Sequence, residues 1–170
     1  MSNDLLRIRR YQPADLAALK SLTLDAFEPV SIDRNMERQF GAIHGHDWKW
    51  RKARHVEADA ERDPDGVFVA EVAVAVVGYI TTWTDADAGL GFIPNLAVDA
   101  GQRGQGIGRR LILHALDHFR QQGLSHARIE TLEQNPIGQQ LYPSLGFREV
   151  ARQVHYCMAL DEEGTAEEDR

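Results

Sequence analysis

The sequence predicts an α/β (α+β) protein built on a mixed, mostly antiparallel sheet, and three observations support this fold class. Short apolar runs with the character of strands occur together with segments that repeat apolar residues at helical spacing. Three strand-like runs follow one another between residues 67 and 98, whereas strands and helices alternate afterwards. With 170 residues, the chain is long enough for one domain with a substantial core.

The first elements are expected to be one strand followed by helices. Residues 6–11 alternate apolar and charged side chains, which is typical of a strand with one buried face. Pro13 suits the first position of the helix that follows. A second amphipathic helix is expected near residues 36–43, and a charged, helix-prone segment spans residues 47–61. The Asp-Pro-Asp-Gly sequence at 63–66 then predicts a turn.

The middle of the chain is predicted to form three strands. Residues 67–77 are rich in valine and alanine, and residues 78–83 are again strand-like. We expect two strands here with a reversal near residues 73–75, although no Asn-Gly or Asp-Gly marks that turn. The third strand covers residues 91–98 and includes the apolar run 93–98.

The last part of the chain is predicted to alternate helices and strands. A glycine-rich loop precedes a helix that extends to Gln122 and ends at Gly123. A strand is expected at residues 127–132, and a helix begins at Asn135 as N-cap with Pro136 as its first residue. Residues 154–160 are expected to form a final strand.

The glycine-rich loop has the composition of a phosphate-binding site. It lies between a strand and a helix N-terminus, where unpaired N–H groups and the helix dipole favour an anion. Glycine leaves the backbone accessible, and Arg103 and Arg109 add positive charge. A Walker loop is excluded because no Gly-Lys-Ser/Thr is present, and the spacing Gly104-x-Gly106-x-Gly108 differs from the Rossmann pattern.

Two segments carry a family resemblance. Arg103-Gly104-Gln105-Gly106-Ile107-Gly108 resembles the Arg/Gln-x-x-Gly-x-Gly/Ala signature of the GNAT superfamily of acyl-CoA-dependent N-acyltransferases. Asn135 followed by Tyr142-Pro143-Ser144-Leu145-Gly146-Phe147 is similar to a second segment of that family. The resemblance implies a GNAT fold over residues 1–160, with a central sheet that splays at a bulged strand and helices on both faces.

The resemblance also implies acetyl-CoA as the co-substrate. The bulged strand would pair with the pantetheine arm, and the N–H groups of the loop would hold the pyrophosphate. Asn135 could contact the cofactor, although a helix cap explains it as well. The cofactor-binding residues implied in this way are Leu96, Ala97, Val98, Arg103, Gly104, Gln105, Gly106, Ile107, Gly108, Arg109 and Asn135.

Two catalytic roles follow from the same resemblance. Tyr142 would be the general acid that protonates the leaving thiolate, although it also suits an ordinary core position. Pro143 is expected to break the helix at the tyrosine. Many members carry a glutamate where this chain has Phe92. Glu130 resembles the glutamate of the ribosomal-protein N-terminal acetyltransferase branch and is the candidate base, with Glu133 as the alternative. An exposed or ion-paired strand residue explains Glu130 equally well.

The predicted reaction is acetyl transfer to a primary amine by direct attack in a ternary complex, because no cysteine lies in the motif region. We favour a small-molecule acceptor, since the family is dominated by such diversity and nothing marks a peptide groove. A protein N-terminus or lysine is the alternative acceptor. A non-catalytic CoA-binding module is the alternative of another class. Trp48 and Trp50 could line the acceptor site, pack internally or contact a second copy in a homodimer.

Composition excludes several other classes of protein. One cysteine, Cys157, excludes an internal disulfide and a multi-cysteine metal site, so no metal is expected. No apolar run is long enough for a membrane span, no basic stripe suggests nucleic acid, and no secretory h-region is present. We therefore expect a cytoplasmic protein. Residues 161–170 carry −5 of the net −7 charge and are expected to form a disordered tail.

Overall fold

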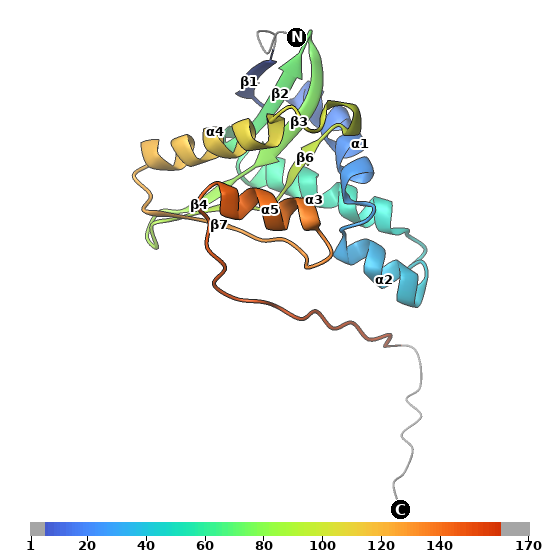
Figure 1. Ribbon diagram of the computed structural model, residues 1–170. Helices are drawn as coiled ribbons and strands as arrows, with labels where there is room; N and C mark the ends of the chain where they lie inside the picture. The colour runs from blue at the N-terminus through green and yellow to red at the C-terminus, as the bar shows by residue number, and fades with distance from the viewer. Residues whose placement is uncertain (1–5, 161–170) are drawn as a thin grey trace, which may run out of the picture.

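A computed structural model describes residues 6–160, so the predicted acidic tail at 161–170 lies outside the described residues. Short 3-10 turns at Pro13–Asp15, Pro64–Gly66 and Ala100–Gln102 link the main elements. The helices and strands, in chain order, are β1 (Leu6–Arg10), α1 (Leu16–Phe27), α2 (Ile32–Phe40), α3 (Trp48–Arg62), β2 (Val67–Val72), β3 (Ala75–Thr81), β4 (Trp83–Asp85), β5 (Leu90–Ile93), β6 (Leu96–Val98), α4 (Ile107–Gln121), β7 (His126–Ile129) and α5 (Pro136–Ser144) (Figure 1).

The strands form a mixed sheet in two parts. One part has the order β1-β2-β3-β6 and is antiparallel throughout; the other has the order β4-β5-β7, in which only β5 and β7 are parallel. The predicted reversal between β2 and β3 is a two-residue turn at Ala73 and Val74, both with positive φ. Turns of this hand match the twist of the strands they join. The mixed, mostly antiparallel sheet is therefore confirmed.

Helices cover both faces of the sheet (Figure 1). The alternation along β2 explains how one strand serves two cores, because successive side chains point to opposite faces. Val67 and Val69 pack with α1 and α3, whereas Phe68 and Ala70 pack on α4. The buried residues that α4 contributes are Ile107, Leu111, Ile112, Ala115 and Phe119.

The sheet splays at the strand that was expected to run without a break from 91 to 98. Pro94 and Asn95 interrupt it and divide it into β5 and β6. β5 is parallel to β7 as far as the pair Ile93 and Ile129, and β6 then continues as a partner of β3 only. Because β7 ends at Ile129, β6 and the chain that follows β7 are no longer paired. A gap in the ladder opens beside the glycine-rich loop.

The predicted last strand at 154–160 is not formed. Residues 148–160 contain no helix or strand, and every side chain in this segment is exposed. The prediction was wrong because it relied on local sequence alone, whereas a strand also needs a partner strand. Figure 1 shows this segment leaving the body below α5.

Candidate active site

The glycine-rich loop takes a conformation that only glycine adopts readily. Gly104 and Gly106 have φ values of +78° and +79°, in the left-handed region. A β-carbon at either position would have no heavy atom within 4 Å. These two glycines are therefore required by the path of the backbone and not by a lack of space.

The loop leads into the start of α4, where backbone N–H groups are available as hydrogen-bond donors. Gly106 is the N-cap of α4, and no side chain of the described residues caps it. The first intrahelical bond runs from the Arg110 N–H to the Gly106 carbonyl, at 3.0 Å. The N–H groups of Ile107, Gly108 and Arg109 precede that bond, so they have no partner within the helix. Arg103, Gln105 and Arg109 are exposed around them, and the Ile107 side chain is buried beneath.

The backbone of β6 faces the gap at every second residue. Thr81 N–H donates to the Asn95 carbonyl at 2.9 Å, and Asp99 N–H donates to the Val77 carbonyl at 2.8 Å. In an antiparallel ladder such bonds alternate, so the backbone of Ala97 also faces β3. The N–H and C=O groups of Leu96 and Val98 consequently face away from β3, toward the gap.

The side chain of Arg103 is hydrogen-bonded to one of these backbone groups. Its Nε donates a 3.2 Å hydrogen bond to the Val98 carbonyl. The guanidinium thus lies between the open strand and the start of α4, beside the two places where the sequence predicts contacts with the cofactor. A ligand that paired with the Val98 carbonyl would take over this bond.

Tyr142 lies on α5, next to the strand and the loop. A β-carbon on Gly108 would lie 3.7 Å from Leu141 and 3.8 Å from Val98, so α4, α5 and β6 meet at this glycine. Tyr142 is half-buried and contacts Phe147 edge to face, with ring centroids 6.2 Å apart. Burial raises the pKa of the Tyr142 phenol to about 12. The phenol therefore remains protonated at neutral pH.

The expected break at Tyr142 does not occur, because α5 continues through Pro143 to Ser144. Proline removes the hydrogen bond to the residue four positions earlier, but here it lies in the last turn, where little helix remains to be disturbed. The Leu145 N–H then closes the helix on the Tyr142 carbonyl at 3.0 Å. Tyr142 is accordingly held in regular helical geometry.

The start of α5 is fixed by Asn135. Its Oδ1 accepts from the Gly138 N–H at 3.2 Å, and its Nδ2 donates to Thr131 Oγ1 at 2.9 Å. A β-carbon on Gly138 would clash with Thr131 at 2.8 Å and would approach the Tyr142 ring at 3.1 Å. Gly138 therefore lets the helix lie closely against Thr131, and Asn135 acts as the N-cap.

Glu130 directly follows β7 and is exposed. Its carboxylate forms an ion pair with Arg128 at 2.6 Å. The Arg128 guanidinium also lies 5.8 Å from the Phe92 ring, and Phe92 stacks on Trp83 with centroids 3.8 Å apart. An aromatic stack thus occupies the position at which the resemblance suggested a glutamate. The alternative base, Glu133, pairs with Arg152 at 2.9 Å.

A buried polar network at the break between β5 and β6 was not predicted from the sequence. Lys52 Nζ donates to Asn95 Oδ1 at 2.9 Å, and Asn95 Nδ2 donates to Asp59 Oδ2 at 2.7 Å. Thr81 donates to the same Asp59 oxygen at 2.7 Å. Desolvation lowers the pKa of Lys52, partly offset by nearby carboxylates. One sequence signal was available: Pro94-Asn95 interrupts an otherwise apolar strand.

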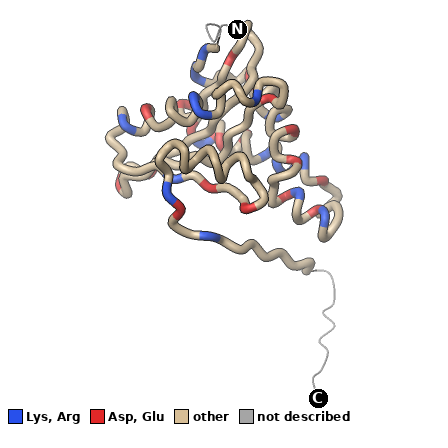
Figure 2. Tube along the Cα trace, in the orientation of Figure 1, with Lys and Arg blue, Asp and Glu red and all other residues tan. Residues whose placement is uncertain are grey.

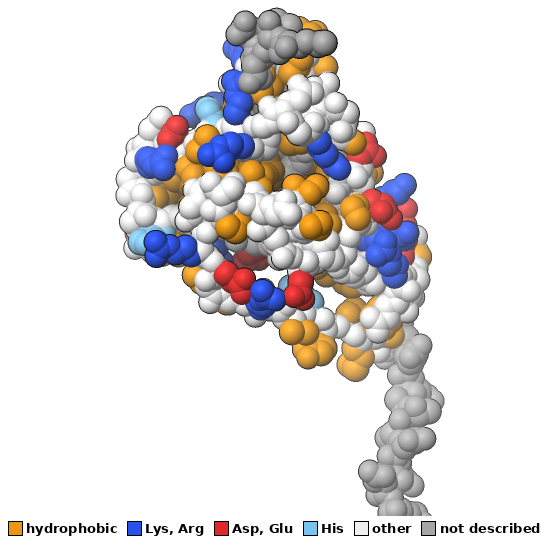
Figure 3. All heavy atoms as spheres, viewed as in Figure 1, with side chains coloured by type: hydrophobic (Ala, Val, Ile, Leu, Met, Phe, Trp, Pro, Cys, Tyr) orange, Lys and Arg blue, Asp and Glu red, His pale blue; other side chains and the backbone are white. Residues whose placement is uncertain are grey.

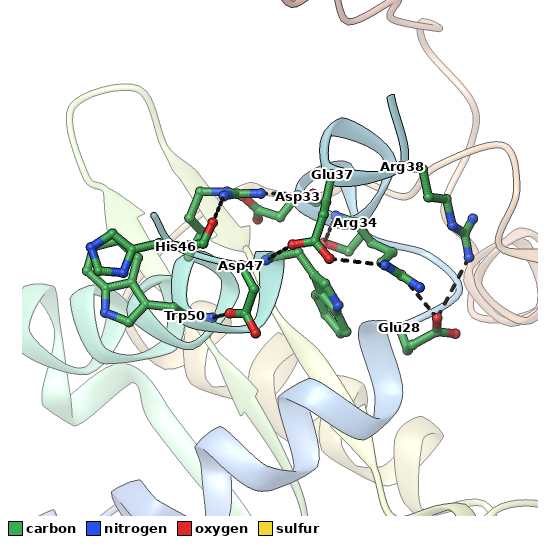
Figure 4. A network of polar contacts seen from close by, with 11 residues as sticks. Glu28, Asp33, Arg34, Glu37, Arg38, His46, Asp47 and Trp50 are labelled. Carbon is green, nitrogen blue, oxygen red and sulfur yellow. Dashed lines mark hydrogen bonds and ion pairs between the residues drawn. The ribbon is translucent and has the colours of Figure 1, made fainter. Parts of the chain in front are cut away.

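The two tryptophans at the α2–α3 corner have different environments, and Figure 4 shows Trp50 beside His46. Trp48 is 3% exposed, and its N–H donates to Glu37. Trp50 is 44% exposed and stacks on His46, with centroids 3.6 Å apart. Trp48 is thus a packing residue, and Trp50 remains accessible. Further ion pairs join Arg34 to Glu28 and Glu37 at this corner, both at 3.2 Å.

Residues 6–160 also bear on metal binding and on membrane insertion. No group of three or more His, Cys, Asp or Glu side chains in this range could hold a metal ion. No helix within it is long and apolar enough to cross a membrane.

Comparison with known proteins finds relatives among acetyltransferases. The chain is 34% identical over 116 residues to a mycothiol acetyltransferase of Thermobispora bispora, a match that covers 64% of this chain and 39% of the relative. It is also 34% identical over 67 residues to the [ribosomal protein bS18]-alanine N-acetyltransferase of Escherichia coli, covering 39% of this chain and 45% of that protein. The chain thus spans less than half of the length of each of these two curated relatives.

Solved structures agree on the fold. The PaiA N-acetyltransferase from Thermoplasma acidophilum, in complex with coenzyme A, superimposes with a TM-score of 0.67 at 18% identity, covering 87% of this chain and 91% of that one. The pattern of the acetyltransferase (GNAT) family matches residues 30–147, which include the splayed strands, the glycine-rich loop and Tyr142. The chain therefore belongs to the acetyltransferase (GNAT) family.

Proposed function

We propose that the chain transfers an acetyl group from acetyl-CoA to a primary amine of a small molecule, by direct attack in a ternary complex. One observation carries the proposal: an uncapped helix start lies beside a strand whose backbone faces an open gap. The first feature suits a phosphate, and the second suits an amide-bearing chain that pairs as an additional strand.

Backbone donors and positive charge support the proposed cofactor site. The N–H groups at the start of α4 can donate to pyrophosphate oxygens, and the exposed Arg103 and Arg109 add positive charge at the loop. The backbone groups of Leu96 and Val98 can pair with the amides of the pantetheine arm. Asn135 contributes to the cofactor site by positioning α5, because its side chain is already used in capping that helix.

The chemical step requires two proton transfers. The amine nitrogen attacks the thioester carbonyl carbon, so a C–N bond forms while the C–S bond breaks. Tyr142 gives its proton to the leaving thiolate and recovers one from solvent. The surplus proton of the amine passes through water to Glu130, which Arg128 holds at the end of β7. A covalent acyl-enzyme is not part of this scheme, because the sole cysteine, Cys157, lies in the exposed 148–160 segment.

The acceptor proposal rests on an accessible corner and on the relatives. Trp50 and His46 offer an exposed aromatic surface at the start of α3. The matched mycothiol acetyltransferases are named for a small molecule, which favours a small amine. The match to the bS18-alanine N-acetyltransferase supports a protein N-terminus as the second candidate.

The test is turnover and binding on one sample. Release of free thiol from acetyl-CoA is followed across small amines, lysine peptides and peptides with free N-termini, while CoA binding is measured by calorimetry. Thiol release that depends on small amines supports the proposal, and release with peptides only favours the second candidate. CoA binding without release on any amine would indicate a non-catalytic binding module, and no binding of CoA at all would contradict the proposed cofactor site.

A further inference from the structure

One face of the strands β4, β5 and β7 carries a continuous stack of aromatic rings and guanidinium groups. Trp83, Phe92 and Arg128 are register partners on the three strands, so their side chains line up across the sheet. The rings of Trp83 and Phe92 stack with centroids 3.8 Å apart and an interplanar angle of 6°. The Arg62 guanidinium lies 3.7 Å from the Trp83 ring centre, and the Arg128 guanidinium lies 5.8 Å from the Phe92 ring centre. A guanidinium group therefore ends the stack on either side.

The stack lies on the face of the sheet that α4 does not cover. A β-carbon on Gly91 would clash with a side chain of α4 at 2.6 Å, so Phe92, the next residue, points to the opposite face. Arg128 points the same way, because the residues that flank it on β7 pack on the α4 core. In Figure 1, α4 and α5 lie in front of the sheet and α3, which ends at Arg62, lies behind it. The stack thus shares the α3 side of the sheet with the buried network at Asn95.

The stack connects α3 to the proposed base. Arg128, at one end, forms the 2.6 Å ion pair with Glu130. Arg62, at the other end, lies three positions after Asp59, so both side chains project from the same side of α3. Asp59 reaches the break between β5 and β6 through its 2.7 Å bond with Asn95. The stack therefore runs beside the break, with Glu130 beyond one end and Arg62 at the other.

Arg62 is the arginine of the stack whose charge is not already neutralised. Within residues 6–160, its side chain forms no ion pair and no hydrogen bond. Two acidic residues follow it closely in sequence, and both are engaged elsewhere. Asp63 accepts from the Gly66 N–H at 3.0 Å, and Asp65 pairs with Arg10 at 2.5 Å. A guanidinium that stacks on a ring keeps its in-plane N–H groups available, in the fork that binds a carboxylate.

The surroundings favour a local attraction for an anion and not a long-range one. Figure 2 shows Lys and Arg interleaved with Asp and Glu along the body, so no broad basic surface is present in this view. Arg128 is paired with Glu130, and Arg152 is paired with Glu133 and with a second carboxylate. Figure 3 shows a basic group flanked by two acidic groups below α5. Among these arginines, Arg62 is left to select an anion.

We propose that Arg62 binds a carboxylate of the acceptor, and that the acceptor is an amine with this carboxylate at the far end of an extended chain. The inference rests on the proposed function, because it places the amine near Glu130. Adjacent strands lie about 4.8 Å apart, so three register partners cross roughly 10 Å of sheet. An ω-amino acid of about six to eight carbons spans this distance when extended. Trp83 is a positioning residue, since its ring holds the Arg62 guanidinium.

Matched acceptors test the assignment. Thiol release from acetyl-CoA is measured for ω-amino acids of about three to ten carbons and for the carboxamide of each. The carboxamide keeps the amine and the chain length but lacks the negative charge. In the natural protein, kcat/KM should favour the carboxylate over its carboxamide by roughly 10-fold to 100-fold, the usual effect of a hydrogen bond to a charged group. This preference should be largest where the chain length matches the stack.

Variants assign the preference to the stack. Arg62→Gln should abolish it, mainly through a higher KM for the ω-amino acids. Trp83→Leu should also raise this KM without lowering kcat, whereas Trp83→Phe keeps a ring under the guanidinium and should retain the preference. Arg54→Gln is the matched control, because Arg54 also lies over a tryptophan of this region, 4.7 Å from the Trp50 ring centre. The preference for the carboxylate should persist in this control.

Turnover without a preference for the carboxylate, or a preference that survives Arg62→Gln, would overturn the inference while leaving the proposed function in place. Failure of the proposed function gives a different result, namely CoA binding without thiol release on any amine. Calorimetric titration of the CoA complex with the ω-amino acids then decides about Arg62. Binding that Arg62→Gln removes and Arg54→Gln retains supports the anion site, and absence of binding to the natural protein overturns it.

Discussion

Lys52 Nζ donates a buried 2.9 Å hydrogen bond to Asn95 Oδ1, which ties α3 to the break between β5 and β6. Lys52 also lies 4.0 Å from the centre of the Phe27 ring. The polar break in the sheet is therefore stabilised by a side chain that lies 43 residues earlier in the chain. The position of β6, and with it the gap beside the glycine-rich loop, depends on this contact.

Replacing Asn95 with Ala should destabilise the protein by about 1–3 kcal/mol, because it leaves a buried ammonium group without its acceptor. Urea denaturation at pH 7 measures this loss. The control is Lys20→Ala, which removes a part-exposed 3.0 Å ion pair with Glu57 and should cost less than about 1 kcal/mol. Equal losses for the two variants would mean that the buried network does not hold the break.

Replacing Gly106 with Ala should weaken CoA binding as well as stability. The left-handed backbone at this residue costs a non-glycine side chain about 1–2 kcal/mol, and relief of that strain would shift the N–H groups of α4. Gly123→Ala is the matched control, because Gly123 has φ +75°, equally open surroundings and a place at the other end of α4. Calorimetry should show weaker CoA binding for Gly106→Ala only. Equal weakening of CoA binding by Gly106→Ala and Gly123→Ala would contradict the assignment of the loop to the cofactor site.

Replacing Tyr142 with Phe should lower the rate of acetyl transfer by roughly 10²–10⁴, the usual contribution of a general acid. CoA binding should not change, because the phenyl ring and its packing remain. Stopped assays of thiol release together with calorimetry separate the two effects. Loss of binding together with turnover would assign Tyr142 a packing role.

The pH profile gives an independent test of Tyr142. Because burial raises the pKa of its phenol to about 12, the acid form persists well above neutral pH. The rate of the natural protein should therefore not fall on the alkaline side below about pH 11. A fall near pH 10, where an unperturbed phenol titrates, would contradict this role.

Asp15 should make the folding stability depend on pH in the acidic range. Arg9 donates two hydrogen bonds to its carboxylate, at 2.8 and 2.9 Å, and these bonds lower the pKa of Asp15. A carboxylate with a lowered pKa stabilises the fold above about pH 4 and loses this effect as the pH falls through the folded-state value. Asp15→Asn should be less stable than the natural protein at pH 7, and urea denaturation should show the difference shrinking toward pH 3. A constant difference across this range would contradict the prediction.

Local sequence was sufficient where one short stretch determines the structure. The strand, glycine-rich loop and helix around Gly106 were predicted because turn glycines, apolar spacing and helix start lie within a few residues. The same holds for Asn135, whose cap requires only the residues that follow it. The reversal at Ala73 and Val74 was also predicted, although its residues are not the usual ones.

Sequence was insufficient where distant residues decide. The break at Asn95 depends on Lys52 and Asp59, which local patterns cannot bring together. The absence of a strand at 154–160 depends on whether a partner strand is in reach. Pro143 was overestimated as a helix breaker because its effect depends on how much helix remains after it.

The β2–β3 turn is a place where the stability of this protein can be increased by substitution. Val74 is β-branched and holds a φ of +67°, and Ala73 holds +47°, so two residues in sequence adopt a backbone that suits Asn and Gly. Val74 is also 90% exposed, so its side chain contributes little to packing. An Asn-Gly turn at these two positions would remove the strain at no cost to the core. Thermal tolerance can thus be raised at a place that contributes no residue to the glycine-rich loop, to β6 or to α5.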